Sequence, residues 1–164
     1  MRIFGIDPGT QATGYGAIDS DGNEHSLVEY GVIRSPRAAF AERLHYIYVE
    51  LLKVIERCHP ERLVVENLFY GANVKSALRL GHVRGVALLA GVSQGLPVFE
   101  YSPLEVKQAV VGYGRADKEQ VQRMVMVLLR LEELPEPHDA ADALAAALCD
   151  AHRLRFTERV APVR

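Results

Sequence analysis

The sequence predicts an α/β fold in which a mixed five-stranded sheet is flanked by helices. Two observations lead to this prediction. The first 33 residues contain three strand-like segments joined by short turns, which is typical of an antiparallel meander. After them, short apolar strand segments alternate with segments of helical periodicity, which places helices on the faces of the sheet. The 164 residues contain no internal repeat and no long linker, so we expect one domain over residues 1–153 and a loose tail over residues 154–164.

The predicted meander is rich in β-branched and aromatic residues. Its three strands are RIFGI (2–6), TGYGAID (13–19) and HSLVEYGVI (25–33). Asp21-Gly22-Asn23 is a turn sequence between the second and third strands. Gly14 and Gly16 lack side chains inside the second strand, so we expect another backbone, or DNA, to approach closely there.

The second part of the chain alternates between helix and strand. Apolar residues recur at helical spacing from Ala38 to Cys58, and Pro60 ends that helix. RLVVE (62–66) is a short buried strand. A glycine-containing helix over residues 73–94 leads to the last strand, PVFEY (97–101).

Two capping boxes mark the next helices. They are SPLE at 102–105 and DKEQ at 117–120, in which the first and last side chains cap each other's backbone N–H groups. The second of these helices is predicted to end near Leu131. The last helix begins after Pro137 and is predicted to end near Arg153.

Composition limits the classes of function. Hydrophobic content of 49% and charged content of 24% are ordinary for a soluble globular protein. The apolar runs are too short to span a membrane and the N-terminus does not resemble a signal peptide, so we expect a cytoplasmic protein with no membrane partner. Cys58 and Cys149 have no metal-binding or redox spacing, which indicates reduced thiols.

Charge is distributed unevenly along the chain. The net charge of −2 argues weakly against a nucleic-acid partner. However, residues 67–130 carry 8 basic and 4 acidic side chains, a net +4 between two acidic flanks. This band would suit a polyanion, although a solvated helix face produces the same pattern.

Four carboxylates stand out on three predicted elements. Asp7 and Glu66 end apolar strands, while Asp139 and Asp142 project from one face of the last helix. That helix is almost all alanine and leucine, so Asp142 should lie near the core, where a carboxylate needs a partner or a metal. Each acid also has a structural explanation, namely an Asx turn, a strand end in water, or the helix macrodipole. His138 could be a further ligand or an acid/base group, but a capping or surface role is favoured.

No Cys or His zinc pattern accompanies these acids. Carboxylates alone predict a hard cation held by oxygen ligands, and Mg²⁺ or Mn²⁺ fits. Two such ions close together can activate water and stabilise the leaving oxygen in phosphodiester cleavage.

Five collinear segments resemble the bacterial RuvC family of Holliday junction resolvases. They are GIDPGTQATGYG, VVENLF, SALRLGHVRGVAL, PVFEYSPLEVKQAVVGYGRADKEQVQ and DAADALAAAL. The resemblance covers residues 1 to about 152. It implies an RNase H-like fold, dependence on divalent metal, and a homodimer that nicks two strands of a four-way DNA junction symmetrically in homologous recombination and DNA repair. It also implies the branch-migration proteins RuvA and RuvB as partners.

The resemblance also implies roles for individual residues. The acids that would bind metal and carry catalysis are Asp7, Glu66, Asp139 and Asp142. Lys107 and Lys118 match the family's DNA-contacting or catalytic lysines, although from the residues alone they read as solvated helix lysines. Phe69 matches an aromatic residue that stacks at the opened junction.

The helix over residues 73–94 is the predicted dimer interface. Small residues would let a second helix pack closely, and larger apolar residues would supply contact. The small residues are Gly81, Gly85, Ala87 and Gly91, and the larger ones are Leu80, Val83, Leu88 and Leu89. The same apolar content would also suit packing on the chain's own sheet.

Three alternative functions are compatible with parts of the sequence. IDPGT also resembles the phosphate loop of sugar kinases and actin-like ATPases, but 164 residues cannot supply their two lobes. A second alternative is an RNase H-like nuclease acting on ribosomal RNA precursors. A third is a junction-binding protein without catalysis, for which four intact acids would be unnecessary.

Overall fold

The computed structural model describes residues 1–67 and 73–160, with side chains described up to Leu154. Its strands form one five-stranded sheet in the order β3-β2-β1-β4-β5. The strands are β1 (Arg2–Asp7), β2 (Ala12–Ser20), β3 (His25–Arg34), β4 (Arg62–Glu66) and β5 (Val98–Tyr101). The first three strands pair antiparallel as the predicted meander, while β4 lies parallel to β1 and β5 parallel to β4. The predicted mixed sheet is confirmed.

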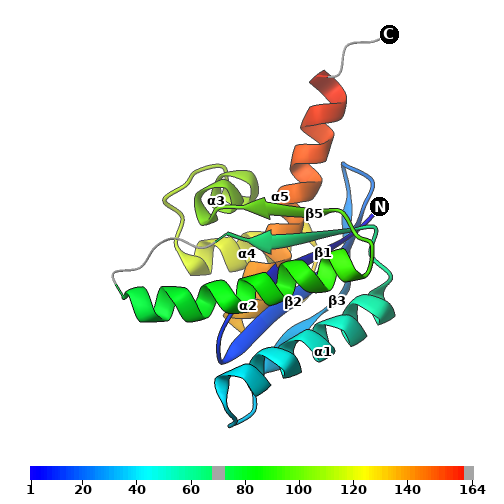
Figure 1. Ribbon diagram of the computed structural model, residues 1–164. Helices are drawn as coiled ribbons and strands as arrows, with labels where there is room; N and C mark the ends of the chain where they lie inside the picture. The colour runs from blue at the N-terminus through cyan, green and yellow to red at the C-terminus, as the bar shows by residue number, and fades with distance from the viewer. Residues whose placement is uncertain (68–72, 161–164) are drawn as a thin grey trace.

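Helices cover both faces of the sheet (Figure 1). On one face lie α1 (Phe40–Cys58) and α2 (Val74–Ser93), which contact each other. On the other lie α3 (Pro103–Val111), α4 (Lys118–Leu128) and α5 (His138–Val160). Both predicted capping boxes are present, at the starts of α3 and α4. Within the described residues, none of the helices combines the length and hydropathy needed to cross a lipid bilayer.

The central strand β1 divides the core into two layers because its side chains alternate between the faces. Phe4 and Ile6 are fully buried against α1 and α2, whereas Ile3 packs on the opposite face against α5. Asp7 shares the face of Ile3 and Gly5, since residues two apart in a strand point the same way. The end of β1 therefore directs its carboxylate toward the side of the sheet that α5 covers.

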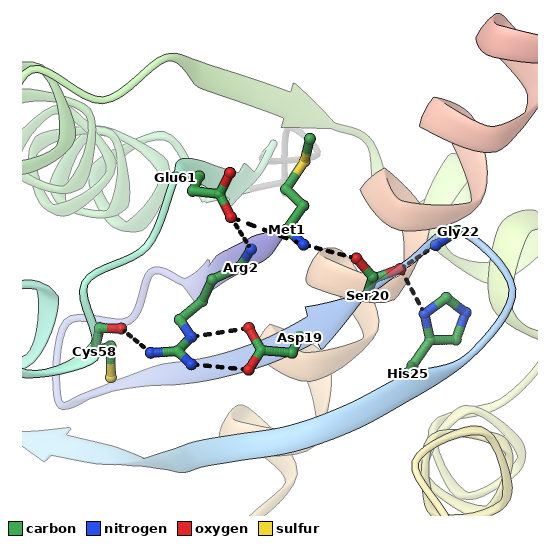
Figure 2. Close-up of polar contacts among 8 residues, drawn as sticks. All are labelled: Met1, Arg2, Asp19, Ser20, Gly22, His25, Cys58 and Glu61. Carbon is green, nitrogen blue, oxygen red and sulfur yellow. Dashed lines mark hydrogen bonds and ion pairs between the residues drawn. The ribbon is translucent and has the colours of Figure 1, made fainter.

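The other end of β1 is held by polar contacts (Figure 2). Arg2 donates from Nε and Nη2 to the two carboxylate oxygens of Asp19 at 2.9 and 2.8 Å, and from Nη1 to the carbonyl oxygen of Cys58 at 2.7 Å. The N-terminal ammonium donates to the carbonyl oxygen of Ser20 at 2.9 Å. These contacts join the start of β1 to β2 and to the end of α1, and so hold this end of the strand in place.

Helix α5 packs closely on the sheet because glycines of β1 and β2 face it. A Cβ atom at Gly5 would lie 2.0 Å from the carbonyl oxygen of Ala143, and one at Gly14 would lie 1.9 Å from that of Asp139. The prediction that another backbone approaches the glycines of the second strand is therefore confirmed, and the backbone is that of α5. Gly16 similarly faces Leu144.

The C-terminal end of α5 differs from the prediction. The helix continues past the expected end at Arg153 to Val160, so the segment 154–160 is helical, where a loose tail was expected. Figure 1 shows this end of α5 extending beyond the edge of the sheet. Leu154, a good helix former that also packs against the core, favours continuation of the helix past Arg153. Residues 161–164 of the expected tail lie outside the described residues.

Candidate active site

Asp7 and Glu66 end neighbouring strands on the same side of the sheet. β1 and β4 are parallel with Ile6 opposite Val65, so the next residue of each strand is an acid. Leu63 and Val65 face α1 and α2, while Val64 faces α5. Glu66 therefore shares the face of Val64, which is also the face of Asp7.

Helix α5 brings two further acids to this place. Asp139 lies in its first turn, where the contact between Gly14 and the Asp139 backbone holds the helix start against β2. Gly14 is also the pairing partner of Asp7, so the start of α5 is held beside the end of β1. Asp142 follows about one turn later, with 18% of its side chain exposed, as expected for a carboxylate near the core.

These elements enclose a cavity of about 260 Å³. Its lining residues are Asp7, Glu66, Pro103, Val106, Lys107, Lys118, Val121 and Asp142. Three acids and two lysines thus meet in one cavity, with an apolar wall supplied by α3 and α4. Asp139 is not among the lining residues, although its charge contributes to the electrostatics of Asp7.

Lys118 is in direct contact with one of the acids. It is the first residue of α4, directly after the capping residue Asp117, and its Nζ donates to Oδ2 of Asp142 at 2.8 Å. This hydrogen bond raises the pKa of Lys118, so the ammonium form is favoured. Lys107 reaches the same cavity from α3.

Ionising both Asp7 and Glu66, the acids at the two strand ends, is unfavourable. Burial raises the pKa of Asp7 to about 9, and the negative charges of Glu66 and Asp142 act in the same direction. Burial also raises the pKa of Glu66 to about 7, with the charge of Asp142 as the next cause, while a hydrogen bond from Asp7 opposes the shift. A proton on Asp7, donated to Glu66, therefore relieves the repulsion between the pair.

The donor set suits a hard cation. Carboxylate oxygens are the ligands preferred by Mg²⁺ and Mn²⁺, and a cation would relieve the same repulsion that the proton relieves. In the described residues, no group of three or more Asp, Glu, His or Cys side chains is arranged to hold a metal ion as it stands. One carboxylate oxygen of Asp142 accepts a hydrogen bond from Lys118.

The raised pKa values predict that Asp7→Asn stabilises the metal-free protein. Asp7 ionises near pH 4 in the unfolded chain but keeps its proton to about pH 9 when folded. Between these values the folded state binds more protons, so the free energy of unfolding falls as pH rises. Asparagine can donate to Glu66 without a charge, so we expect a gain of at least about 1.4 kcal/mol at pH 8, the value of one pKa unit. Urea unfolding in EDTA should show the difference widening from pH 5 to pH 8, and a difference independent of pH would contradict this account.

The remaining predicted site residues lie elsewhere. Phe69 falls outside the described residues. His138 is exposed at the start of α5 and does not line the cavity, in agreement with the favoured surface role. Sequence reasoning did not select Pro103, Val106 and Val121 as cavity wall. In the sequence these three residues are marked only by the apolar spacing of the helices that became α3 and α4, which does not identify a cavity.

Comparison with known proteins identifies the family. A family model described as crossover junction endodeoxyribonuclease RuvC matches residues 3–150. The chain belongs to the RuvC family.

RuvC proteins of known sequence and structure match almost the whole chain. The crossover junction endodeoxyribonuclease RuvC of Pelotomaculum thermopropionicum is 51% identical, with 98% of each chain covered, and that of Heliobacterium modesticaldum is 54% identical, covering 95% of this chain and 97% of the relative. The solved structure of Thermus thermophilus RuvC in complex with a Holliday junction substrate is 35% identical, with a TM-score of 0.86, and covers 95% of this chain and 96% of that one. The RNase H-like fold implied by the sequence motifs is confirmed by these RuvC matches. They give no support to the alternative of a nuclease for ribosomal RNA precursors.

Proposed function

We propose that this RuvC-family protein is a metal-dependent endodeoxyribonuclease that resolves four-way (Holliday) DNA junctions by paired symmetric nicks in homologous recombination and DNA repair. The observation that carries the proposal is the acid-lined cavity at the ends of β1 and β4, in a chain that matches the RuvC family over residues 3–150. Family membership implies divalent metal use. We place the enzyme in the cytoplasm, where bacterial DNA lies.

The proposed metal ligands are the four acids of the two strand ends and α5. They are Asp7, Glu66, Asp139 and Asp142. We propose that these acids hold two ions, either Mg²⁺ or Mn²⁺. The ions would supply an activated water and would stabilise the leaving oxygen. The raised pKa values of Asp7 and Glu66 support this assignment, because they reflect buried carboxylates that repel one another, and a bound cation would relieve that repulsion.

The two cavity lysines would act on DNA. Lys118, whose ammonium is held at the cavity by its hydrogen bond to Asp142, would bind a phosphate of the DNA there. Lys107 contributes a second positive charge from α3. Phe69 is proposed to stack on a base at the opened junction.

Cleavage of a synthetic four-way junction tests the proposed function. We expect two nicks at symmetric positions in the presence of Mg²⁺ or Mn²⁺, no nicks in EDTA, and little cleavage of duplex DNA of the same sequence. A structured RNA serves as the control substrate for the alternative nuclease class. Efficient cleavage of RNA or plain duplex, or metal-independent nicking, would contradict the proposal.

The role of Lys107 can be resolved by one substitution. If it contacts a phosphate, Lys107→Ala should reduce the slope of log K against log salt by roughly 0.9, the value of one phosphate contact on duplex DNA. If it instead stabilises charge at the scissile phosphate, the slope should stay the same while turnover falls by about a hundredfold. Fluorescence anisotropy across a salt series and single-turnover cleavage separate the two roles. An unchanged slope with unchanged turnover would leave Lys107 as a surface lysine.

We also propose that the protein acts as a homodimer through α2. An apolar and small-residue stripe runs along the outer face of this helix, including Leu78 and Leu89, which are 62% and 57% exposed. The full stripe is Val74, Leu78, Gly81, Gly85, Leu89 and Val92. A Cβ at Gly81 or Gly85 would meet no atom within 4 Å, so another helix can approach closely there. A second copy of this chain is the fitting partner, because two equivalent strands are cut and a two-fold dimer presents two equal sites.

The predicted interface set is corrected in part. Val83 and Ala87 are fully buried against the chain's own sheet, and a Cβ at Gly91 would strike Val98 and Leu63. These three residues therefore serve the core, because only one face of α2 is free of the sheet. RuvA and RuvB stay proposed partners on the strength of the family alone.

Gly85→Glu is expected to give folded monomers that have lost paired nicking. The monomer has open space for the new side chain, but a charge in an apolar helix contact would be buried without a partner. Sedimentation reports the mass, and a supercoiled cruciform reports the pairing, since one nick relaxes the cruciform before a second cut. Val127→Glu places the same charge on an exposed apolar site of α4, on the other side of the sheet, and should stay dimeric. A wild-type protein that is monomeric even on a junction would overturn the paired-site model.

A further inference from the structure

Besides Asp139 and Asp142, α5 carries a buried carboxylate that does not line the cavity, that of Asp150. Asp150 is fully buried, and its Oδ1 accepts hydrogen bonds from Oη of Tyr101 at 2.7 Å and from Nη2 of Arg62 at 3.0 Å. Nε of Arg62 also lies 2.7 Å from Oδ2, as an ion pair without hydrogen-bond geometry. A buried charge is costly, so this arrangement needs an explanation.

Each partner of Asp150 is itself held in place. Arg62 begins β4, only 12% of its side chain is exposed, and its guanidinium stacks 3.8 Å from the ring centre of Phe99 in β5. Tyr101 ends β5 and is almost completely buried. The cluster therefore joins α5 to the two strands on the far side of β1 with directional contacts.

Where α5 packs against β4, the rest of its buried face is apolar. It is built mainly from alanine, with Leu144 and Leu148 as its large side chains. Methyl groups pack well at several displacements along a strand, whereas an arginine–carboxylate pair fits only one. A polar contact in an apolar interface can thus fix the register between two elements.

The register that this cluster fixes is the one that places the cavity acids. Arg62 and Glu66 are on one face of β4, four residues apart, which is about 13 Å along a strand. Asp142 and Asp150 are eight residues apart in α5, which is about 12 Å along a helix. Because the two spacings match, pairing Asp150 with Arg62 at one end brings Asp142 beside Glu66 at the other.

We propose that Asp150, with Arg62 and Tyr101, is a positioning cluster that sets the register of α5 on β4 and thereby the placement of Asp142 beside Glu66. The inference rests on the proposed metal-binding role of these two acids. A shift of one element along the other would separate the two carboxylates and weaken a cation held between them. None of the three cluster residues lines the cavity, so we expect the cluster to act on the cation only through geometry.

The proposal is tested by measuring the Mn²⁺ dissociation constant of the full chain, with no DNA present. The electron paramagnetic resonance signal of free Mn²⁺ reports how much Mn²⁺ is bound, so the test does not depend on turnover. Asp150→Asn is expected to raise the Mn²⁺ dissociation constant about tenfold. This is the lower end of the effect of losing a direct hydrogen-bond partner of a metal ligand, because Asp150 acts on Asp142 only through the position of α5. Tyr101→Phe removes one hydroxyl and should raise it about threefold, and it keeps the test informative if Asp150→Asn does not fold. Junction affinity in EDTA should be unchanged in both variants.

A matched control separates positioning from stability. Leu51→Ala destabilises the core from the opposite face of the sheet, and its Mn²⁺ affinity should equal that of the wild type. The double variant Arg62→Met with Asp150→Leu should recover thermal stability, since apolar residues can replace a buried ion pair, but should keep the weakened Mn²⁺ affinity. If Tyr101→Phe and Asp150→Asn bind Mn²⁺ like the wild type, or if the double variant restores affinity with stability, the positioning role is refuted.

A reference variant distinguishes a wrong positioning role for the cluster from a wrong metal-binding role for the cavity. Asp7→Asn should remove the high-affinity Mn²⁺ site altogether. If the wild type has no such site, or if Asp7→Asn leaves it intact, the metal-binding assignment of the cavity is itself wrong. If Asp7→Asn removes the site while the Asp150 and Tyr101 variants leave it unchanged, only the positioning cluster is wrong.

Discussion

Asp7→Asn is expected to lower the rate of junction cleavage on the order of a thousandfold while junction binding survives or tightens. Asp7 lies at the end of the central strand, beside Glu66, where burial and then the charges of Glu66, Asp142 and Asp139 raise its pKa to about 9. Removing its charge would weaken metal binding and cost several kcal/mol of transition-state stabilisation, where about 1.4 kcal/mol is tenfold in rate. Binding should persist because Asp7 is proposed to hold the cation and not to contact DNA.

Single-turnover cleavage and anisotropy with a labelled junction measure the two quantities separately. Asp21→Asn is a matched control, because Asp21 is an exposed aspartate of the turn between β2 and β3 and lies far along the strands from the cavity. Near-normal cleavage by Asp7→Asn would show that Asp7 only shapes the turn into Pro8. Loss of junction binding together with cleavage would instead indicate a misfolded variant.

The second large effect is expected from Gly14→Ala, a single methyl group outside the cavity. The added Cβ would lie 1.9 Å from the backbone carbonyl oxygen of Asp139, and a backbone atom cannot move aside as a side-chain tip can. The start of α5 must shift, which costs about 1–3 kcal/mol of stability as overpacking does. A displacement on the order of 1 Å at a catalytic group can cost about a hundredfold in rate. The cleavage rate of Gly14→Ala should therefore fall further than the loss of folded protein alone would explain.

Gly81→Ala is the control for adding a methyl group to a glycine. Its Cβ would enter open space on α2, so the monomer should be as stable as the wild type or slightly more stable, as alanine is favoured in helices. Thermal unfolding and single-turnover cleavage at a temperature where both variants are folded give the comparison. Full activity of Gly14→Ala would mean that the contact between α5 and β2 does not place Asp139 and Asp142.

Much of the fold was determined by local signals in the sequence. Alternating apolar residues identified the strands, and the capping boxes at Ser102 and Asp117 located the starts of α3 and α4 to the residue. These signals are local because capping and strand alternation depend on residues at most a few positions apart. The cavity acids at the strand ends were also found this way, since a carboxylate after a buried strand is conspicuous. Asp139 and Asp142 required the alanine-rich composition of α5 and the family motif.

The tertiary structure decided the relations between distant residues. It turned Ala87 and Gly91 toward the sheet and Gly85 outward, because the side of α2 that is buried depends on where β4 and β5 lie. It also paired Lys118 with Asp142 across 24 residues. Asp150 carried no local signal and looked like one more acid of a helix, yet its partner Arg62 stands 88 residues away. Such partners emerge only when the sheet and α5 are packed together, since burial and pairing are properties of the assembled core and not of any one segment.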